Sequence, residues 1–331
     1  MTMKNFIAAL ASFTLGAAAL LTHATAAAQP GGYPDRSIRL ITPFPPGGGT
    51  DVVARIIGAR LSQQMGQQVI IDNRAGAGGS LGTDLAAHAP ADGYTLVLGS
   101  SATHAVNPSL YGHLGYDPIA DFAPVSLVAQ TSLLLMVRPT LPVKNVAELV
   151  ALAKQRPAGT GLTFASAGPG SAQHLGGELF KSLSGANLLH VPYRGAGPAM
   201  TDLLAGQVDM MFDTKPSALP QMRAGKLRAL GVSSAQRDPD LPGVPAIGET
   251  VPRYELVTWY ALFAPKGTPP AIVERLNAEV QRALASEQVR ERFKAAGVEP
   301  SGSSAAALGA LVKAEVPKWR RVIQESGAKL D

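Results

Sequence analysis

The residues best suited to chemistry lie in a glycine-rich stretch, Pro43–Gly49, with the sequence PFPPGGG. The apolar run Ile38–Ile41 before it is typical of a buried strand, and Thr50 is a favourable helix N-cap before the helically spaced apolar residues of Val52–Ile57. Glycines have no Cβ to hold a ligand away from the backbone. A strand–loop–helix junction also directs free N–H groups and the positive end of a helix dipole to one point. The stretch therefore predicts an anion-binding loop.

The type of anion follows from what surrounds these glycines. No Gly-Lys-Ser/Thr sequence follows them, and they do not form the G-x-G-x-x-G pattern of dinucleotide-binding loops. A small carboxylate is thus favoured over a phosphate. The alternative is a glycine-rich turn that binds nothing.

Two further glycine loops, Asn73–Gly79 and Ser166–Ser171, also separate expected strands from helices. A third strand, Tyr94–Gly99, ends in the polar segment Ser100–His104. In open α/β sheets, ligands lie at the carboxyl ends of the strands. Phe44–Gly49 and Ser100–His104 are therefore expected at one rim of the sheet.

Two serines raise the alternative of a periplasmic serine hydrolase. Ser80 lies in a G-x-S-x-G pattern, but that motif requires a strand running directly into the serine, and the expected strand ends near Asp72. Ser171 and His174 are three residues apart, without an evident carboxylate to orient the histidine. A helix-capping role for Ser80 and a binding role for Ser171 are favoured over catalysis.

Composition excludes several classes of function. The chain has 29 Lys+Arg against 24 Asp+Glu, 5% aromatic residues and no basic run, which makes a nucleic-acid partner a poor hypothesis. It has no cysteine, so disulfides and thiolate metal sites are impossible. None of its six histidines is paired at i, i+4. We therefore expect neither a metal nor a cofactor.

Residues 1–28 resemble an export signal. Lys4 precedes the apolar run Phe6–Leu21, and Ala26–Ala28 provides small residues for cleavage. The run is shorter than the roughly 20 residues of a membrane span. The leader predicts a periplasmic protein from which the signal is removed.

The rest of the chain alternates short strands with helices, which predicts an α/β fold with parallel, open sheets flanked by helices. The chain is long enough for two hydrophobic cores. We expect a discontinuous first domain, 29–128 plus 235–331, and an inserted second domain, 129–234, with crossings near Ala129 and Ser234.

Seven stretches spread along the mature chain resemble one family, the Bug-type periplasmic solute-binding receptors of tripartite tricarboxylate transporters. They are PFPPGGGTDVVAR, IDNRAGAGGSLGTD, ADGYTLVLGSSATHAVNPSLY, DFAPVSLVA, FASAGPGSAQHLGGELF, HVPYRGAGPAMTDLLAGQVDMMFD and LNAEV. The resemblance implies a type II-like, two-domain periplasmic binding protein with two open mixed sheets, a hinge and an interdomain cleft. It also implies a receptor that closes like a Venus flytrap on a small carboxylate (an organic acid, dicarboxylate or amino acid) and performs no chemical step. Nothing in the sequence demands more than a monomer. The implied partners are membrane transporter subunits, contacted transiently; a carboxylate sensor for a signalling pathway is the alternative.

The resemblance also implies ligand contacts on three loops. The first loop would hold a carboxylate through backbone N–H groups, partly through bridging waters. Asp213 would accept hydrogen bonds from a ligand ammonium or hydroxyl. The implied contact residues are Phe44, Pro45, Gly47, Gly48, Gly49, Ser101, Thr103, His104, Ser166, Gly168, Ser171, His174 and Asp213.

Three other residues have a structural and a functional interpretation. Lys215 either reaches a second carboxylate or is solvated at the cleft rim, and the solvated position is favoured. For His190 a hydrogen-bonded structural role is favoured over a ligand contact, and Trp259 is expected in a wall or core.

Overall fold

The computed structural model of the protein describes residues 32–157 and 159–326. The predicted export signal, 1–28, lies outside these residues. Contacts divide the chain into 1–35 and 36–331, and all the helices and strands below belong to the second of these units. In the described part of the chain, no helix is both long and apolar enough to cross a membrane.

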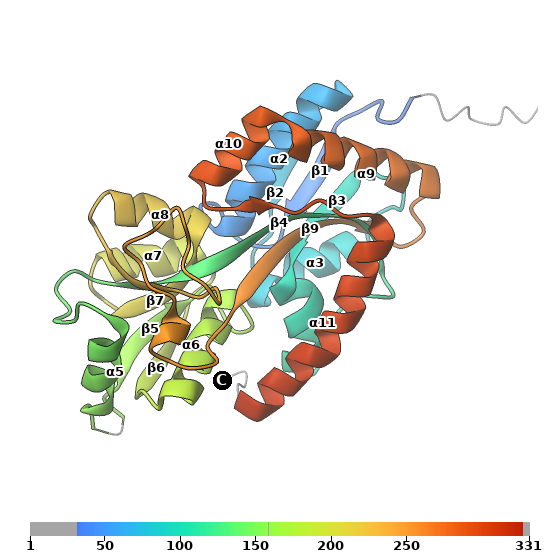
Figure 1. The fold of residues 1–331 in the computed structure, drawn as a ribbon. Coiled ribbons are helices and arrows are strands. Elements are labelled where there is room, and N and C mark those ends of the chain that lie inside the picture. Colours follow the sequence, from blue (N-terminus) through green and yellow to red (C-terminus); the bar gives the residue numbers. More distant parts are fainter. Residues whose placement is uncertain (1–31, 158, 327–331) are drawn as a thin grey trace, which may run out of the picture. The chain divides into compact units, whose positions relative to one another are not determined.

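The strands form one mixed sheet in the order β2-β1-β3-β9-β4-β7-β5-β6, with β8 and β10 also paired with β4 (Figure 1). Pairing is parallel among β1, β2 and β3 and among β5, β6 and β7, whereas β4 and β9 run antiparallel to their neighbours. The strands are β1 (Ile38–Thr42), β2 (Val69–Asn73), β3 (Thr95–Ser100), β4 (Phe122–Val137), β5 (Leu162–Ser166), β6 (Leu188–Pro192), β7 (Met210–Thr214), β8 (Arg228–Val232), β9 (Val257–Pro265) and β10 (Glu299–Pro300).

Strand β4 joins two groups of strands. Its residues from Phe122 to Ser132 pair with β9, and those from Leu133 to Val137 pair with β7. We call β1–β3, β9, β10 and the start of β4 the first half of the sheet, and β5–β8 with the end of β4 the second half. The two expected sheets are therefore continuous through one 16-residue strand.

The helices flank both halves. Helix α2 packs against α9 and α10 beside the first half (Figure 1), and α6 packs on β5 and β7 in the second. The helices are α2 (Gly49–Met65), α3 (Ser80–Ala87), α4 (Asn107–Leu110), α5 (Val146–Lys154), α6 (Ala172–Ser184), α7 (Ala196–Leu204), α8 (Lys215–Arg223), α9 (Pro270–Ala285), α10 (Glu287–Ala295) and α11 (Ala305–Ser326), with short η1 (Ala77–Gly79), η2 (Ala102–Val106, a π-type helix) and η3 (Ile247–Glu249).

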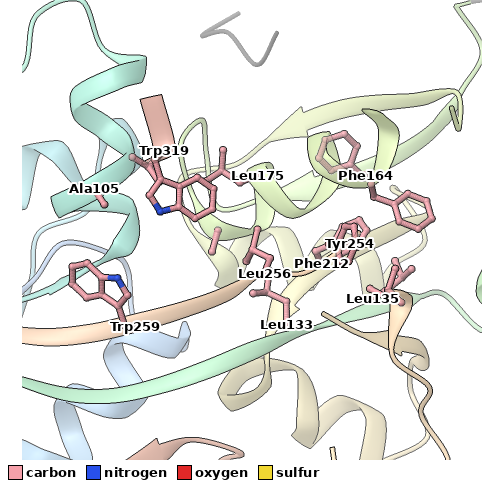
Figure 2. Close-up of a cluster of buried hydrophobic side chains, with 14 of the residues drawn as sticks. Ala105, Leu133, Leu135, Phe164, Leu175, Phe212, Tyr254, Leu256, Trp259 and Trp319 are labelled. Carbon is pink, nitrogen blue, oxygen red and sulfur yellow. The ribbon is translucent and has the colours of Figure 1, made fainter. Parts of the chain in front are cut away.

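A hydrophobic core cluster extends across both halves (Figure 2). Trp259 of β9 is buried in it, as predicted. Trp319 of α11 belongs to the same cluster, and α11 contacts both η2 in the first half and α6 in the second. The C-terminal helix therefore links the two halves through apolar packing.

The segment between β8 and β9 packs with the second half. Tyr254 lies with Phe180 and Phe212 in an aromatic cluster, and its hydroxyl donates to the Gly176 carbonyl at 3.0 Å. The chain thus remains with the second half until just before β9.

Candidate ligand-binding site

A cavity of about 30 Å³ lies where loops of the first half meet loops of the second. None of its lining residues carries a formal charge. They are Phe44, Gly48, Gly49, Thr50, Ser100, Ala102, Ala167, Ser171, Ala172, Gln173, Ala196, Thr214, Thr258 and Tyr260.

Four helices begin at this cavity. The first residues of α2, α6 and α7 line it, and so does Thr214, the N-cap of α8. Of these four helices, only α6 has a side-chain cap, because Ser171 Oγ accepts a hydrogen bond from the His174 backbone N–H. The N-caps of α2, α7 and α8 form no such bond. Unsatisfied first-turn N–H groups and four positive dipole ends therefore favour an anion here.

The first glycine loop is held in shape by Asp51, in the first turn of α2. The Gly47 N–H donates to its carboxylate at 3.0 Å, and Asn73 Nδ2 donates both to that carboxylate and to the Phe44 carbonyl, each at 3.0 Å. Burial acts to raise the pKa of Asp51, but hydrogen bonds from Arg55, Asn73 and Gly47 outweigh it and lower the pKa. Asp51 therefore stays ionised and fixes the loop. It also occupies the Gly47 N–H, which the sequence had suggested for the ligand.

The polar wall of the first half comes from adjacent strands. Ser100 at the end of β3 is the cross-strand partner of Tyr260 in β9, and Thr258 lies two residues before Tyr260. The Tyr260 hydroxyl lies near Thr214 Oγ1, since a Cβ on Gly49 would meet both, and burial raises the pKa of Tyr260 above its usual range. The wall is therefore neutral and lined with hydroxyl groups.

Asp213 lies behind this wall and is fully buried. Its carboxylate accepts hydrogen bonds from Gln173 Nε2 at 3.0 Å, from the Thr214 N–H at 2.8 Å and from Ser217 Oγ. Burial raises the pKa of Asp213 to about 6, against the opposing effect of these hydrogen bonds. Gln173 and Thr214 line the cavity, so Asp213 positions two wall residues and does not line the cavity itself.

The structure brings some predicted contact residues to the cavity and places others elsewhere. Phe44, Gly48, Gly49 and Ser171 line it. Pro45 and Gly168 line a neighbouring hollow of about 190 Å³, which shares Phe44 and Ala167 with the cavity.

Three predicted residues after β3 turn into the protein interior. Ser101 Oγ is hydrogen-bonded to Thr258 Oγ1 at 2.6 Å, and Thr103 Oγ1 accepts a hydrogen bond from the Ser100 N–H at 3.0 Å. The His104 ring stacks on Phe263 at 3.9 Å between centroids, and burial lowers its pKa to about 3. The chain enters η2 directly after Ser100, which redirects these side chains. In contrast to the prediction, Ser100 and Ala102 line the cavity instead.

Two predicted residues of the second half also point away from the cavity. Ser166 Oγ is hydrogen-bonded to His190 Nε2 at 2.7 Å, and His174 Nδ1 accepts a hydrogen bond from the Gly170 N–H at 3.2 Å. The rings of His174 and His190 stack with centroids 4.3 Å apart. The hydrogen-bonded position predicted for His190 is confirmed, whereas Ser166 and His174 support the loop from behind.

Lys215 differs from both of its sequence interpretations. Its side chain is 7% exposed, and its Nζ lies 2.6 Å from the carboxylate of Asp238, which is 10% exposed. It lines a separate hollow together with Glu255 and Glu299. The favoured prediction of a solvated lysine is wrong, because the segment between β8 and β9 provides a buried counter-charge.

The hydroxyl groups of the two candidate nucleophiles are engaged in structural hydrogen bonds. Ser80 begins α3, and its Oγ accepts from Asn107 Nδ2 at 3.0 Å. Ser171 Oγ donates to the Gly168 carbonyl at 2.6 Å and accepts from the His174 backbone. These bonds fix loops and do not form a serine–histidine pair.

Four wall residues were not predicted from the sequence: Gln173, Thr214, Thr258 and Tyr260. The sequence contained a signal for two of them. Thr258 and Tyr260 alternate with apolar residues in β9, which places both on one face of a buried strand. Thr214 and Gln173 carried no comparable signal, because their position depends on where α8 and α6 begin.

Comparisons with known proteins agree with this geometry. The family model "Tripartite tricarboxylate transporter family receptor" (TctC) matches residues 53–328. Protein BugT of Bordetella pertussis is 40% identical over 334 residues, covering 100% of both chains. A protein from the tcbD-tcbE intergenic region of a Pseudomonas strain is 42% identical over 311 residues, covering 93% of this chain and 92% of its own.

Solved structures show the same fold. The structure of R. palustris Rpa4515 with adipate has a TM-score of 0.87 and 40% identity, covering 90% of this chain and 99% of its own. MatC from Rhodopseudomonas palustris with bound malate has a TM-score of 0.82 and 37% identity, covering 88% and 99%. The periplasmic binding protein BugD has a TM-score of 0.86 and 36% identity, covering 90% and 99%. The chain therefore has the periplasmic binding protein fold of the Bug type, and it belongs to the tripartite tricarboxylate transporter family of receptors.

Proposed function

We propose that the protein is a solute-binding receptor that captures a small carboxylate between the two halves of its sheet. The observation that carries the proposal is the convergence of four helix N-termini on a cavity without charged side chains. Such a site stabilises a negative charge through backbone dipoles and N–H groups. The adipate and malate bound by two relatives support an organic acid as the ligand.

Closure of the two halves is the proposed mechanism. The ligand would contact both halves at once and thus stabilise the closed form by its higher affinity for that form. The strand pairing supports two lobes that exchange in β4 after Ser132 and again between Leu256 and Val257. The first boundary lies close to the predicted crossing at Ala129, whereas the second lies well after Ser234, so we assign the segment 235–256 to the second lobe and not to the first.

In the cell, we propose that the receptor acts in the periplasm as a monomer and passes its ligand to the membrane subunits of a tripartite transporter. It would perform no chemical step and use no cofactor. The structural hydrogen bonds of Ser80 and Ser171 support a binding role over hydrolysis.

A thermal-shift screen of the mature protein against mono-, di- and tricarboxylates, amino acids and aromatic acids tests the proposal. A ligand at about 100 times its Kd adds roughly 2.7 kcal/mol to the free energy of unfolding, which raises Tm measurably. Native mass spectrometry of the purified protein detects any acid that is already bound. If no carboxylate shifts Tm and no acid is bound, the proposed function is wrong.

A further inference from the structure

We propose that Ser100 is a ligand-binding residue whose hydroxyl donates a hydrogen bond to the carboxylate of the captured acid. The inference rests on the proposed function and assigns one atom of the wall to the ligand. The sequence placed Ser100 in a segment at the rim of the sheet but did not include it among the implied contact residues.

The first observation is a buried hydroxyl without a partner. Ser100 is 4% exposed, and within the described part of the chain its Oγ forms no hydrogen bond. Of the buried side-chain atoms in this condition, it is the one whose residue lines the cavity. An unsatisfied buried polar group costs about 1–3 kcal/mol. A hydroxyl kept at that cost, in the wall of a binding cavity, is explained by a bond to the ligand.

Other buried serines of the same sheet show the contrast. Ser126 Oγ donates to the carbonyls of Leu127 and Ser303 at 2.7 and 3.0 Å. Ser233 Oγ donates to Leu256 O at 2.5 Å and accepts from the Leu133 N–H at 2.7 Å. These two buried serines of the sheet therefore have hydrogen-bond partners for their hydroxyls, whereas Ser100, at the cavity, has none.

The second observation is the fixed backbone of Ser100. Thr103 Oγ1 lies 3.0 Å from its N–H and 3.2 Å from its carbonyl oxygen. The backbone is thus held between β3 and η2, and the hydroxyl needs little reorganisation to meet a ligand. Preorganised donors of this kind lose little entropy on binding.

The third observation is a second donor beside it. Tyr260, the cross-strand partner of Ser100, also lines the cavity. Its raised pKa keeps the phenol protonated, so its hydroxyl is a neutral donor beside Ser100. Two adjacent neutral donors match the two oxygens of one carboxylate, and an ammonium group would find the helix N-termini repulsive.

The test compares Ser100→Ala with a matched control, Ser126→Ala, in the full mature protein. Kd for adipate and for malate is measured by titration calorimetry, and Tm is measured without added acid. We expect Ser100→Ala to raise Kd about tenfold or more, about 1.4 kcal/mol. Its Tm without acid should stay equal or rise, because the removed hydroxyl had no partner. Ser126→Ala should lower Tm and leave Kd within about twofold, about 0.4 kcal/mol.

The outcomes separate the two proposals. If wild type binds an acid and Ser100→Ala binds it equally well, the inference about Ser100 is overturned and the receptor function stands. A Tm loss in Ser100→Ala as large as in Ser126→Ala would show that the hydroxyl is structural, which also overturns it. If wild type binds no carboxylate in the wider screen, both proposals fail together.

Discussion

Thr214 of the second half occupies the space that a side chain at position 49 of the first half would need, and that position is a glycine. A Cβ at residue 49 would overlap Thr214 Oγ1 and also the Tyr260 hydroxyl. The first residue of α2 is therefore pressed against the N-cap of α8. The two halves can approach this closely only because residue 49 has no side chain.

Gly49→Ala should consequently weaken ligand binding more than tenfold, over about 1.4 kcal/mol, because the added methyl group holds the halves apart. Gly48→Ala is the comparison, since its Cβ would lie 3.6 Å from Ala196 Cβ, an ordinary contact. The loss of ligand affinity in Gly48→Ala should be smaller than in Gly49→Ala. Calorimetry with the acid selected by the screen measures both, and an unchanged affinity in Gly49→Ala would mean that binding does not require this approach.

The buried pair of Lys215 and Asp238 should stabilise the fold without contacting the ligand. Asp238→Asn leaves a buried ammonium without its counter-charge, so we expect the free energy of unfolding to fall by about 3 kcal/mol. Adding Lys215→Met should restore part of that loss. Urea unfolding measures both variants. Lys215→Met alone should bind the acid as wild type does. A tenfold weaker affinity would mean that Lys215 contacts the ligand after all.

Ligand affinity should rise as pH falls from 7.5 to 5.5. Above its pKa of about 6, Asp213 carries a negative charge directly behind an anion-binding wall, and below that pKa it is neutral. The groups facing it are Gln173, Thr214, Ser217 and Tyr260, and only Tyr260 can titrate, far above this range. Bound carboxylate therefore favours the protonated form of Asp213.

We expect Kd to decrease by about threefold or more over this interval, about 0.7 kcal/mol, for an acid that stays ionised throughout. Titration calorimetry in buffers of different ionisation enthalpy should show proton uptake on binding near pH 6 to 7. Asp213→Asn should abolish both effects. A Kd independent of pH in wild type would contradict the proposed coupling.

Arg194 provides a test of ligand length. It is the one charged residue lining the hollow beside the cavity, and within the described residues it has no hydrogen bond or ion pair. We expect Arg194→Gln to weaken adipate binding about tenfold, about 1.4 kcal/mol, and to change hexanoate binding little, because only adipate carries a second carboxylate. Arg320→Gln, which removes an exposed charge from α11 outside the lining of the hollow, controls for net charge. Equal losses for both acids would argue against a distal carboxylate at Arg194.

The sequence predicted the scaffold of the site better than its surface. The strand before Pro43 and the helix that follows the glycines were predicted and are confirmed as β1 and α2, because apolar periodicity is a local signal. The predicted N-cap, Thr50, is wrong, because the helix begins at Gly49 and its N-cap is Gly48. The α/β class and the receptor family were also predicted and are confirmed. The leader, 1–28, lies outside the described residues, so it stays a prediction.

The direction of the side chains after β3 could not be predicted. Whether Ser100 or Ser101 faces the cavity depends on the residue at which β3 ends and η2 begins, and a shift by one residue exchanges the two faces. Lys215 was misjudged for a related reason. Its partner Asp238 is 23 residues away, in a segment without a strong secondary-structure pattern.

The uncharged lining of the cavity has a consequence for the effect of ionic strength. Receptors that hold an anion with exposed lysine or arginine lose affinity as salt screens the pair. Here the opposing partial charges are backbone dipoles at the buried first turns of helices that line the cavity, where mobile ions cannot enter between them and a bound ligand. Affinity for an acid with a single carboxylate should therefore vary little between dilute and concentrated salt, whereas the part of the adipate affinity that depends on Arg194 should fall.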